Sequence, residues 1–345
     1  MMIRVLIADD SLLVRQVLTD ILEESGEEIA VIGYACNGKE AAERTVGLKP
    51  DLVIMDLVMP GVDGMEGIEK IMANTPTPVL VLSAALEGCE GDQPGNAIRR
   101  GALDVMLKPD LGAPGALRVF SQRLIEKVKV LGGIKVTRHP RRKPSPPRQE
   151  ETRQQPSVPP KILAIGASTG GPRAVMTLLR ELPANFPASV FVVQHIAHGF
   201  AAGFATWLDR ECALPVRVAE DGDRFLPGLA LVAPDGCHMT VSDGKIKLVQ
   251  GEPVNCCRPS IDVFFNSLAE QKCNQVVSLL LSGMGKDGAQ GLLRIREQGG
   301  TTLVQDEGSC AVFGMPKAAI GLRAADQVLP LDRMPSAISR LFALA

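Results

Sequence analysis

Acidic residues stand at the ends of two apolar segments in the first 60 residues of the chain. Asp9 and Asp10 follow the run IRVLIA, and Asp56 ends the run DLVIMD. A carboxylate can attack phosphorus and form an aspartyl phosphate, and Mg²⁺ binds a few carboxylates together with waters and phosphate oxygens. We therefore expect Asp56 to accept a phosphoryl group, while Asp9, Asp10 and Asp56 hold Mg²⁺.

Two more polar residues close the apolar runs that follow. Ser83 ends PVLVLS, and Lys108 ends LDVMLK directly before Pro109. We expect the lysine ammonium to neutralise the transferred group and the serine hydroxyl to donate a hydrogen bond to it. The alternative is that such acids only cap helix N-termini, a role that Asp favours. One Asp would fit that alternative, whereas the whole set favours a phosphorylation site.

A second reactive pattern, Gly-x-Ser-x-Gly, surrounds Ser168 directly after the run KILAIG. Its glycines allow a sharp strand-to-helix turn that exposes the serine hydroxyl. The N-terminus of the next helix offers N–H groups to an oxyanion. A dinucleotide-binding loop is the competing interpretation, but the G-x-G-x-x-G spacing is missing and Gln194-His195, not an acid, ends the next strand. No G-K-[ST] follows, so the loop is not a P-loop either.

A serine hydroxyl needs a base before it can attack, and the chain has four histidines. His195 directly follows the run SVFVVQ and is therefore at a strand end, like Ser168. His139 lies in a proline-rich segment, and His198 is three residues beyond His195. His238 either lines the pocket or is packed in a turn. We predict that His195 is the base.

The base in turn needs a carboxylate to orient it. Asp287 lies in LLLSGMGKDGAQG, where another apolar run meets a glycine-rich turn. Taken alone, Asp287 is also compatible with a helix-capping role. A serine, a histidine and an aspartate at three strand ends favour a catalytic triad.

These groups converge only if the segments before them lie side by side. Residues 1–130 alternate helical patterns with Val-, Ile- and Leu-rich runs, which is typical of a parallel sheet buried on both faces. Ligands bind such sheets at the carboxyl ends of the strands. The expected strands are 3–8, 29–35, 51–56, 78–83 and 103–108, and the expected helices include 12–24, 39–48 and 117–130. Five βα units predict a flavodoxin-like, doubly wound domain.

The composition changes in residues 131–160, which are rich in Pro, Arg and Gln. We interpret this segment as an extended linker. Residues 161–345 resume the alternation and predict a second α/β domain with a parallel or mixed sheet. Its expected strands are 161–166, 189–194, 228–234, 246–250, 276–282 and 301–306.

The overall composition is typical of a cytoplasmic protein. The 37 basic and 39 acidic residues nearly balance, so no overall field would attract nucleic acid or an anionic membrane. No apolar run approaches the roughly 18 residues of a membrane span, and the N-terminus has no secretory signal pattern. The eight cysteines include no C-x-x-C pair, which predicts reduced thiols.

The N-terminal segment resembles a response-regulator receiver domain over about 125 residues, through DDS at 9–11, MDLVMPGVDG at 55–64 and LKP at 107–109. Two features depart from that pattern. Val105 stands where receivers usually carry Tyr or Phe, so an aromatic switch of the usual form is not expected. Glycines and a proline in 88–96 weaken the first turn of the fourth helix.

The C-terminal segment resembles the catalytic domain of the CheB family, the chemotaxis protein-glutamate methylesterases. The similar stretches are AIGASTGGP (164–172), VVQH (192–195), APDGCHM (233–239), RPSIDVFF (258–265), LSGMGKDGAQGL (281–292) and QDEGSCAVFGMPKAA (305–319). The resemblance implies Ser168 as nucleophile, His195 as base and Asp287 as orienting acid. It also implies that Thr169 and the Met284 N–H serve the oxyanion.

The resemblance further implies a substrate and partners. The substrate is a glutamate γ-methyl ester on methyl-accepting chemotaxis receptors, whose glutamines the same site would deamidate. A chemotaxis histidine kinase would be the phosphodonor, Mg²⁺ would serve only the receiver domain, and ester hydrolysis would need no cofactor. Cys256 and Cys257 stand where the family more often has a histidine and a variable residue, and Ile196-Ala197 replaces Met-Pro after His195.

Two other functional classes remain open at this point. Receiver domains often precede DNA-binding domains, but no helix-turn-helix pattern follows residue 160. A receiver fused to an inactive binding module would keep the fold and lack the serine, histidine and aspartate set. Release of methanol from methylated receptors separates these possibilities.

Overall fold

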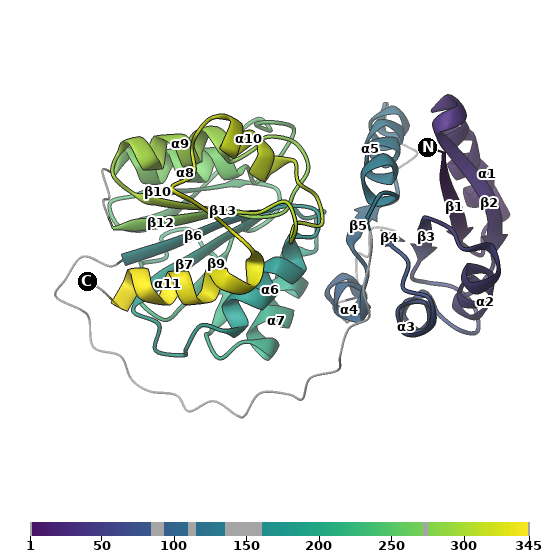
Figure 1. Ribbon diagram of the computed structural model, residues 1–345, viewed down its shortest axis with the longest axis horizontal. Helices are drawn as coiled ribbons and strands as arrows, with labels where there is room; N and C mark the ends of the chain where they lie inside the picture. Colours follow the sequence, from purple (N-terminus) through teal and green to yellow (C-terminus); the bar gives the residue numbers. More distant parts are fainter. Residues whose placement is uncertain (1, 84–92, 110–114, 135–160, 272–274, 344–345) are drawn as a thin grey trace. The chain divides into compact units, whose positions relative to one another are not determined.

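The computed structural model describes residues 2–83, 93–109, 115–134, 161–271 and 275–343. The chain divides into two compact units, Met1–Arg142 and Lys143–Ala345 (Figure 1). Most of the expected linker, 131–160, lies outside the described residues, although helix α5 continues to Leu131. His139, Cys89, Cys273 and most of 88–96 also lie outside them.

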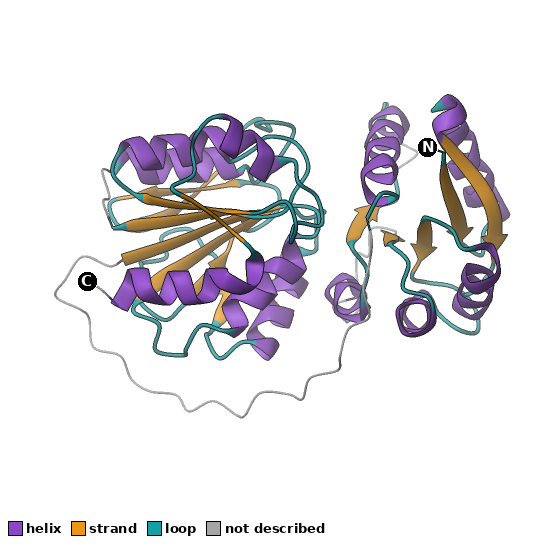
Figure 2. Ribbon diagram, viewed as in Figure 1, coloured by secondary structure: helices purple, strands orange, loops and turns teal. Residues whose placement is uncertain are grey.

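The N-terminal unit is a five-stranded parallel sheet in the order β2-β1-β3-β4-β5 (Figure 2). Helices α1 and α5 pack on one face, and α2, α3 and α4 pack on the other. The strands are β1 (Ile3–Ala8), β2 (Ile29–Ala35), β3 (Leu52–Asp56), β4 (Val79–Ser83) and β5 (Asp104–Leu107). The helices are α1 (Leu12–Glu23), α2 (Gly38–Leu48), α3 (Gly64–Asn74), α4 (Gln93–Arg100) and α5 (Ala116–Leu131), with a 3₁₀ turn at Gly26–Glu28. This arrangement confirms the expected doubly wound fold.

Local sequence explains where these helices begin. The side chains of Ser11, Asn37 and Asp63 accept hydrogen bonds from backbone N–H groups in the first turns of α1, α2 and α3. Such caps satisfy N–H groups that have no partner inside the helix. Every residue of β3 and β4 is buried, which accounts for their unbroken apolar sequences.

The C-terminal unit contains a seven-stranded sheet in the order β14-β13-β12-β6-β7-β9-β8. Every pairing within it is parallel. The strands are β6 (Lys161–Ala167), β7 (Ala188–Gln194), β8 (Val216–Val218), β9 (Ala230–Val232), β12 (Val276–Leu280), β13 (Thr301–Gln305) and β14 (Gln327–Leu329). An antiparallel pair, β10 (His238–Ser242) and β11 (Lys245–Val249), stands apart from this sheet.

Helices cover both faces of the seven-stranded sheet. In Figure 1, α6, α7 and α11 lie on one face, and α8, α9 and α10 lie on the other. Their bounds are α6 (Gly171–Arg180), α7 (Ala201–Glu211), α8 (Ile261–Glu270), α9 (Ala289–Glu297), α10 (Met315–Gly321) and α11 (Met334–Ala343), with a 3₁₀ turn at Leu331–Arg333. Phe264 and Phe265 of α8 and Phe191 of β7 are fully buried in the core between this helix and the sheet.

The six strands expected in this unit are present, with bounds that differ by a few residues. The segment expected at 246–250 forms β11 of the separate hairpin, so the large sheet is parallel and not mixed. The sequence patterns did not predict β8, β10 and β14. Strands β8 and β14 have only three residues each, too few to show a period. Across the described ranges, no helix has the length and apolar character required to cross a bilayer.

Candidate active site and acidic cluster

Ser168 and His195 lie at the carboxyl ends of two neighbouring strands. Strands β6 and β7 pair in register up to Ala167 and Gln194, so the next residue of each strand leaves the sheet at the same edge. The His195 N–H donates to the Ala167 carbonyl at 2.9 Å, which continues the ladder by one bond. The fold therefore brings the predicted nucleophile and the predicted base together.

The turn after Ser168 depends on glycine. Gly170 has a φ of 75°, and a Cβ atom there would lie 2.4 Å from the Ala311 Cβ atom. Helix α6 begins at the next residue, with Pro172 in its first turn. Ser168 is half-buried, and its hydroxyl forms no hydrogen bond with any residue that the structure describes. The hydroxyl is thus available to a substrate.

Asp287 is the partner of the His195 ring. Its Oδ2 atom lies 2.8 Å from His195 Nε2, and the two side chains are 2% and 12% exposed. Burial alone would lower the pKa of His195, but hydrogen bonds to Asp287 and Cys257 and their charges raise it to about 9. Burial opposes ionisation of Asp287 as well, yet the contact with His195 lowers its pKa to about 2. The pair is therefore set up as a carboxylate beside an imidazole that binds a proton strongly.

The carboxylate of Asp287 is fixed by the segment that begins α8. Its Oδ1 atom accepts from the Ser260 hydroxyl at 2.8 Å and the Asn255 amide at 2.9 Å. The backbone N–H groups of Ile261 and Asp262 donate to its two oxygens at 2.7 and 3.2 Å. These N–H groups belong to the first turn of a helix, where donors lack intrahelical acceptors. The carboxylate of Asp287 is thus fixed by donors from residues 255–262, a segment distant in sequence from the loop that carries Asp287.

Asn255 joins Asp287 to a second acid. Its amide donates to Asp262 Oδ2 as well, at 2.9 Å. Burial and the nearby charge of Asp287 raise the pKa of Asp262. The sequence analysis did not identify Asn255, Ser260 or Asp262 as site residues. Two signals were available: Ser260 and Asp262 lie in the family-like stretch RPSIDVFF, and Ser260 directly precedes an apolar helical run, where an N-cap is expected.

The two groups expected to bind an oxyanion also lie at this edge. Thr169 is buried, and its carbonyl accepts from the Ser282 hydroxyl at 2.8 Å. The Met284 N–H donates to no acceptor among the described residues. It belongs to a loop held by Gly283, whose N–H donates to the Val312 carbonyl at 3.0 Å.

The other two described histidines have partners elsewhere. His198 is 80% exposed on its side chain and pairs with Asp235 at 2.8 Å. His238 is buried, accepts from the Ser260 N–H at Nδ1, and lies 3.0 Å from the Glu252 carbonyl through Nε2. Both nitrogens of His238 are therefore used within the fold. Of the two interpretations of His238, the geometry favours a packed turn histidine.

The acidic cluster of the N-terminal unit forms around one lysine. Lys108 Nζ lies 2.7 Å from Asp9 Oδ2 and 2.7 Å from Asp56 Oδ2. Burial raises the pKa of Asp56, and the nearby Asp9 adds to this while Lys108 opposes it. The pKa of Lys108 is raised, because its bonds to both acids outweigh its burial. The lysine and the two acids therefore lie close enough together to contact one phosphoryl group.

Two more observations concern the expected Mg²⁺ and phosphate ligands. Asp9, Asp10 and Asp56 each offer an oxygen within 4.8 Å of the others, and Asp9 and Asp56 are buried while Asp10 is exposed. This all-oxygen donor set fits Mg²⁺. Ser83 is buried at the end of β4, and its carbonyl accepts from the Lys108 N–H at 2.7 Å. Val105 is 8% exposed on β5.

Both parts of the chain match known families. The model of the CheB methylesterase family matches residues 163–338, and that of the response regulator receiver domain matches residues 5–113. The chain belongs to the CheB methylesterase family. A relative named protein-glutamate methylesterase/protein-glutamine glutaminase 2, from Anaeromyxobacter dehalogenans, is 44% identical over 98% of this chain and 97% of its own length.

Further relatives agree with this assignment. A CheB-family relative from Syntrophus aciditrophicus, protein-glutamate methylesterase/protein-glutamine glutaminase 1, is 40% identical over 99% of this chain and 98% of its own length. The crystal structure of the Thermotoga maritima CheB methylesterase catalytic domain is 38% identical. The structural match covers 55% of this chain and 100% of the crystallised chain, with a TM-score of 0.51. The CheB-type fold of the C-terminal unit is therefore shown by sequence and structure together.

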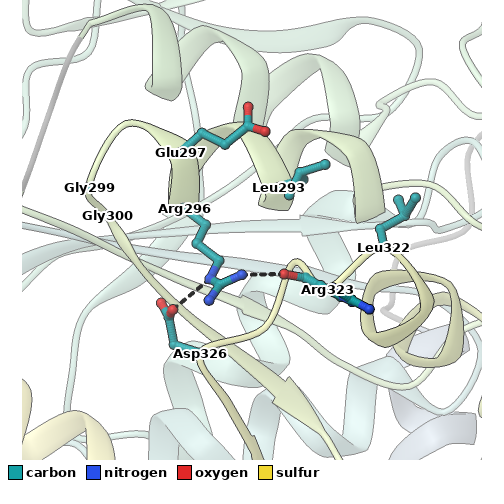
Figure 3. Close-up of a pocket in the computed structure, with 8 residues that line it drawn as sticks. All are labelled: Leu293, Arg296, Glu297, Gly299, Gly300, Leu322, Arg323 and Asp326. Carbon is teal, nitrogen blue, oxygen red and sulfur yellow. Dashed lines mark hydrogen bonds and ion pairs between the residues drawn. The ribbon is translucent and has the colours of Figure 1, made fainter.

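A surface hollow of about 540 Å³ lies in a different part of this CheB-family unit (Figure 3). Arg296 spans it, with its guanidinium 2.7 Å from Asp326 and 2.5 Å from the Arg323 carbonyl. These polar groups satisfy one another, and none of the predicted site residues line the hollow. The bonds of Arg296 join α9 to the segment before β14, so Arg296 has a structural role here.

Proposed function

We propose that this chain is a protein-glutamate methylesterase and protein-glutamine glutaminase whose activity is controlled by phosphorylation of its receiver domain. The observation that carries the proposal is the His195–Asp287 pair, at 2.8 Å, beside Ser168 on the neighbouring strand end. Substrates would be γ-methyl esters of glutamates, and glutamines, on methyl-accepting chemotaxis receptors. The phosphodonor would be a histidine kinase of the chemotaxis type.

The hydrolytic step begins with Ser168. Its Oγ attacks the ester carbonyl carbon while His195 takes the hydroxyl proton. Because Nε2 of His195 faces Asp287, Nδ1 is the ring nitrogen that would accept this proton. The negative charge that develops on the carbonyl oxygen would be stabilised by the Met284 N–H and by Thr169.

The second half of the reaction reverses these roles. His195 returns its proton to the leaving methoxy oxygen, and methanol departs. Water, deprotonated by His195, then attacks the glutamyl-serine ester and releases the free carboxylate. A glutamine follows the same course with ammonia as the leaving group. Asp287 stays ionised throughout and stabilises the imidazolium, consistent with its pKa of about 2.

The receiver domain supplies control. Asp56 would accept the phosphoryl group, and Asp9, Asp10 and Asp56 would hold Mg²⁺. When bound, the metal supplies charge neutralisation to the phosphoryl oxygens. Lys108, already in contact with Asp9 and Asp56, would move one of its bonds to the phosphoryl group. Ser83 would donate its hydroxyl to the same group.

The direct test measures methanol released from methylated receptor in membranes. Wild type should release it, and Ser168→Ala and His195→Gln should not. His198→Ala is the matched control, because this histidine is exposed and pairs with Asp235 outside the site. Undiminished release by Ser168→Ala would refute the nucleophile assignment. Absence of release by a folded, phosphorylated wild type would support an inactive binding module instead.

A further inference from the structure

Cys257 lies against the proposed base, His195, near the ring nitrogen that Asp287 does not contact. Its Sγ atom is 3.5 Å from His195 Nδ1. The side chain is half-buried, whereas the neighbouring Cys256 is exposed. The imidazole is therefore flanked by a carboxylate at one nitrogen and a thiol at the other. The catalytic mechanism above uses the carboxylate and leaves the thiol without a role.

An unusual turn places Cys257 there. Val254 and Cys257 exchange two backbone hydrogen bonds, at 3.1 and 2.9 Å. Between them, Asn255 and Cys256 have φ values of 52° and 61°. Two consecutive left-handed residues define a tight turn that usually carries Asn and then Gly. Here a cysteine takes the glycine position, and such strain persists only where surrounding contacts enforce it.

Those contacts are the ones that orient the base. The Asn255 amide donates to both Asp262 and Asp287, so the turn is tied to the carboxylate that holds His195. Asp287 thus contacts both the turn that carries Cys257 and the His195 ring, which fixes the position of the thiol relative to the imidazole. A thiol fixed beside an imidazole is half of a common zinc ligand set.

The spacing between the two atoms fits one tetrahedral zinc ion. With Zn–S of about 2.3 Å and Zn–N of about 2.0–2.1 Å, a tetrahedral angle separates sulfur and nitrogen by about 3.5 Å. The observed separation of Sγ and Nδ1 is 3.5 Å. A zinc-bound histidine almost always donates its other ring N–H to a carboxylate, a backbone carbonyl or water. His195 already has the carboxylate arrangement, with Nε2 2.8 Å from Asp287.

Asp287 itself would stay outside the coordination sphere. A carboxylate oxygen of Asp287 lies within 4.8 Å of the His195 and Cys257 ligand atoms. Both of its oxygens, however, already accept hydrogen bonds, among them those from Ser260 and Ile261. Asp287 therefore orients the ligand histidine, and water completes the four positions.

We propose that Cys257 and His195 form a Zn²⁺ site through which zinc inhibits the hydrolase. Binding replaces the thiol proton and the proton on Nδ1 of the protonated imidazole: Cys257–SH, His195–H⁺ and Zn²⁺ give a zinc-bound thiolate and imidazole and two released protons. The metal then occupies Nδ1, the nitrogen that must take the proton of Ser168. Inhibition rests on the proposed function, whereas zinc binding does not. Mg²⁺, which prefers oxygen ligands, would leave this site empty.

Binding is tested separately from catalysis with Co²⁺ as a spectroscopic probe on reduced, full-length protein. A cobalt–thiolate absorption band should appear in wild type and in Ser168→Ala. Cys257→Ser and His195→Gln should each lose it, and Cys256→Ser, the matched control in the same turn, should retain it. A band that persists in both Cys257→Ser and His195→Gln would place the metal elsewhere and overturn the site.

Inhibition is tested by methanol release with Zn²⁺ present. Saturating Zn²⁺ should lower the initial rate by about 10-fold or more, and EDTA should restore it. Cys257→Ser should keep most of its rate at the same concentration, and Cys256→Ser should be inhibited like wild type. Equal inhibition of Cys257→Ser and wild type would overturn the proposal. A Cys257-dependent cobalt band in a chain without esterase activity would instead support the metal site and refute the proposed function.

Discussion

Asp287 Oδ2 lies 2.8 Å from Nε2 of His195, so the proton exchange proposed for His195 falls to Nδ1. The same carboxylate receives backbone and side-chain donors from the start of α8. An acid with this many donors stays ionised and rigid. One buried carboxylate therefore orients the His195 ring and, together with Cys257, raises the pKa of His195.

The first prediction concerns pH. The groups that face His195 are Asp287 and Cys257, and their contacts raise its pKa to about 9 against the effect of burial. The base works only as neutral imidazole, so esterase kcat/KM should rise with pH from neutrality up to about 9. Initial rates measured across this range with EDTA present would check it. A profile that is already flat above pH 7 would contradict the prediction.

The second prediction concerns Asp287→Asn. The amide cannot stabilise the imidazolium and favours the wrong tautomer, so kcat should fall by about 10⁴-fold, as in other triads. The pKa of His195 should fall as well, because the adjacent negative charge is gone. Single-turnover rates and histidine NMR titration would measure both effects. Asp235→Asn is the control: this acid bonds Gly199 and His198, and its loss should leave the rate nearly unchanged.

The sequence predicted the parts of this site that follow from strand ends. Ser168 and His195 are found one residue after adjacent parallel strands, and glycine spacing marks the turn. The residues that hydrogen-bond to Asp287 could not be predicted in the same way. Asn255 and Cys257 reach the site through a turn with two positive φ values and no glycine, and only tertiary contacts enforce such a turn. The catalytic roles of Ser168 and its partners stay predictions until the rates are measured.

The third prediction concerns Asn255→Ala. The change removes the donor to Asp287 and Asp262 and places alanine at a φ of 52°. Each lost bond to a buried charged group costs about 1.5–3 kcal/mol, so the free energy of unfolding should fall by a few kcal/mol. Urea denaturation would measure this. Asn255→Gly isolates the amide, since glycine tolerates the left-handed backbone. Equal stability of wild type and Asn255→Gly would show that the amide bonds contribute nothing.

The fourth prediction concerns Gly283→Ala. A Cβ atom at this position would lie 2.6 Å from the Ser168 Cβ atom and 2.5 Å from the Met315 sulfur. The Met315 side chain is flexible and can move away. The Ser168 Cβ atom can move only if the backbone of the turn after β6 moves with it. Ser168 should therefore shift, and a displacement of about 1 Å can cost about 10²-fold in rate. Gly321→Ala is the control, because a Cβ atom there would meet nothing within 4 Å beyond its own helix, and kcat should stay unchanged. Steady-state kinetics of both variants would decide.

The last prediction concerns the acidic cluster and its control of the hydrolase. With Mg²⁺ and a small phosphodonor, wild type should form an acid-stable, base-labile acyl phosphate, and Asp56→Asn should not. Asp63→Asn is the matched control, because Asp63 caps α3 through an oxygen that asparagine also provides. Lys108→Ala should leave Asp9 and Asp56 without their shared cation. Since the cation offsets the repulsion of the two acids, this variant should also lose the response.

Phosphorylation should then raise methanol release in wild type and Asp63→Asn, and in neither of the other two variants. A coupling of about 1–3 kcal/mol corresponds to about 5–150-fold activation. Mass spectrometry of the labelled peptide and parallel rate measurements would check site and effect together. Labelling at Asp56 without any change in the rate of methanol release would show that phosphorylation of the receiver domain does not control the hydrolase. It would leave phosphorylation of Asp56 as a signal for location or partner binding, because a modification shifts activity only through unequal effects on two states.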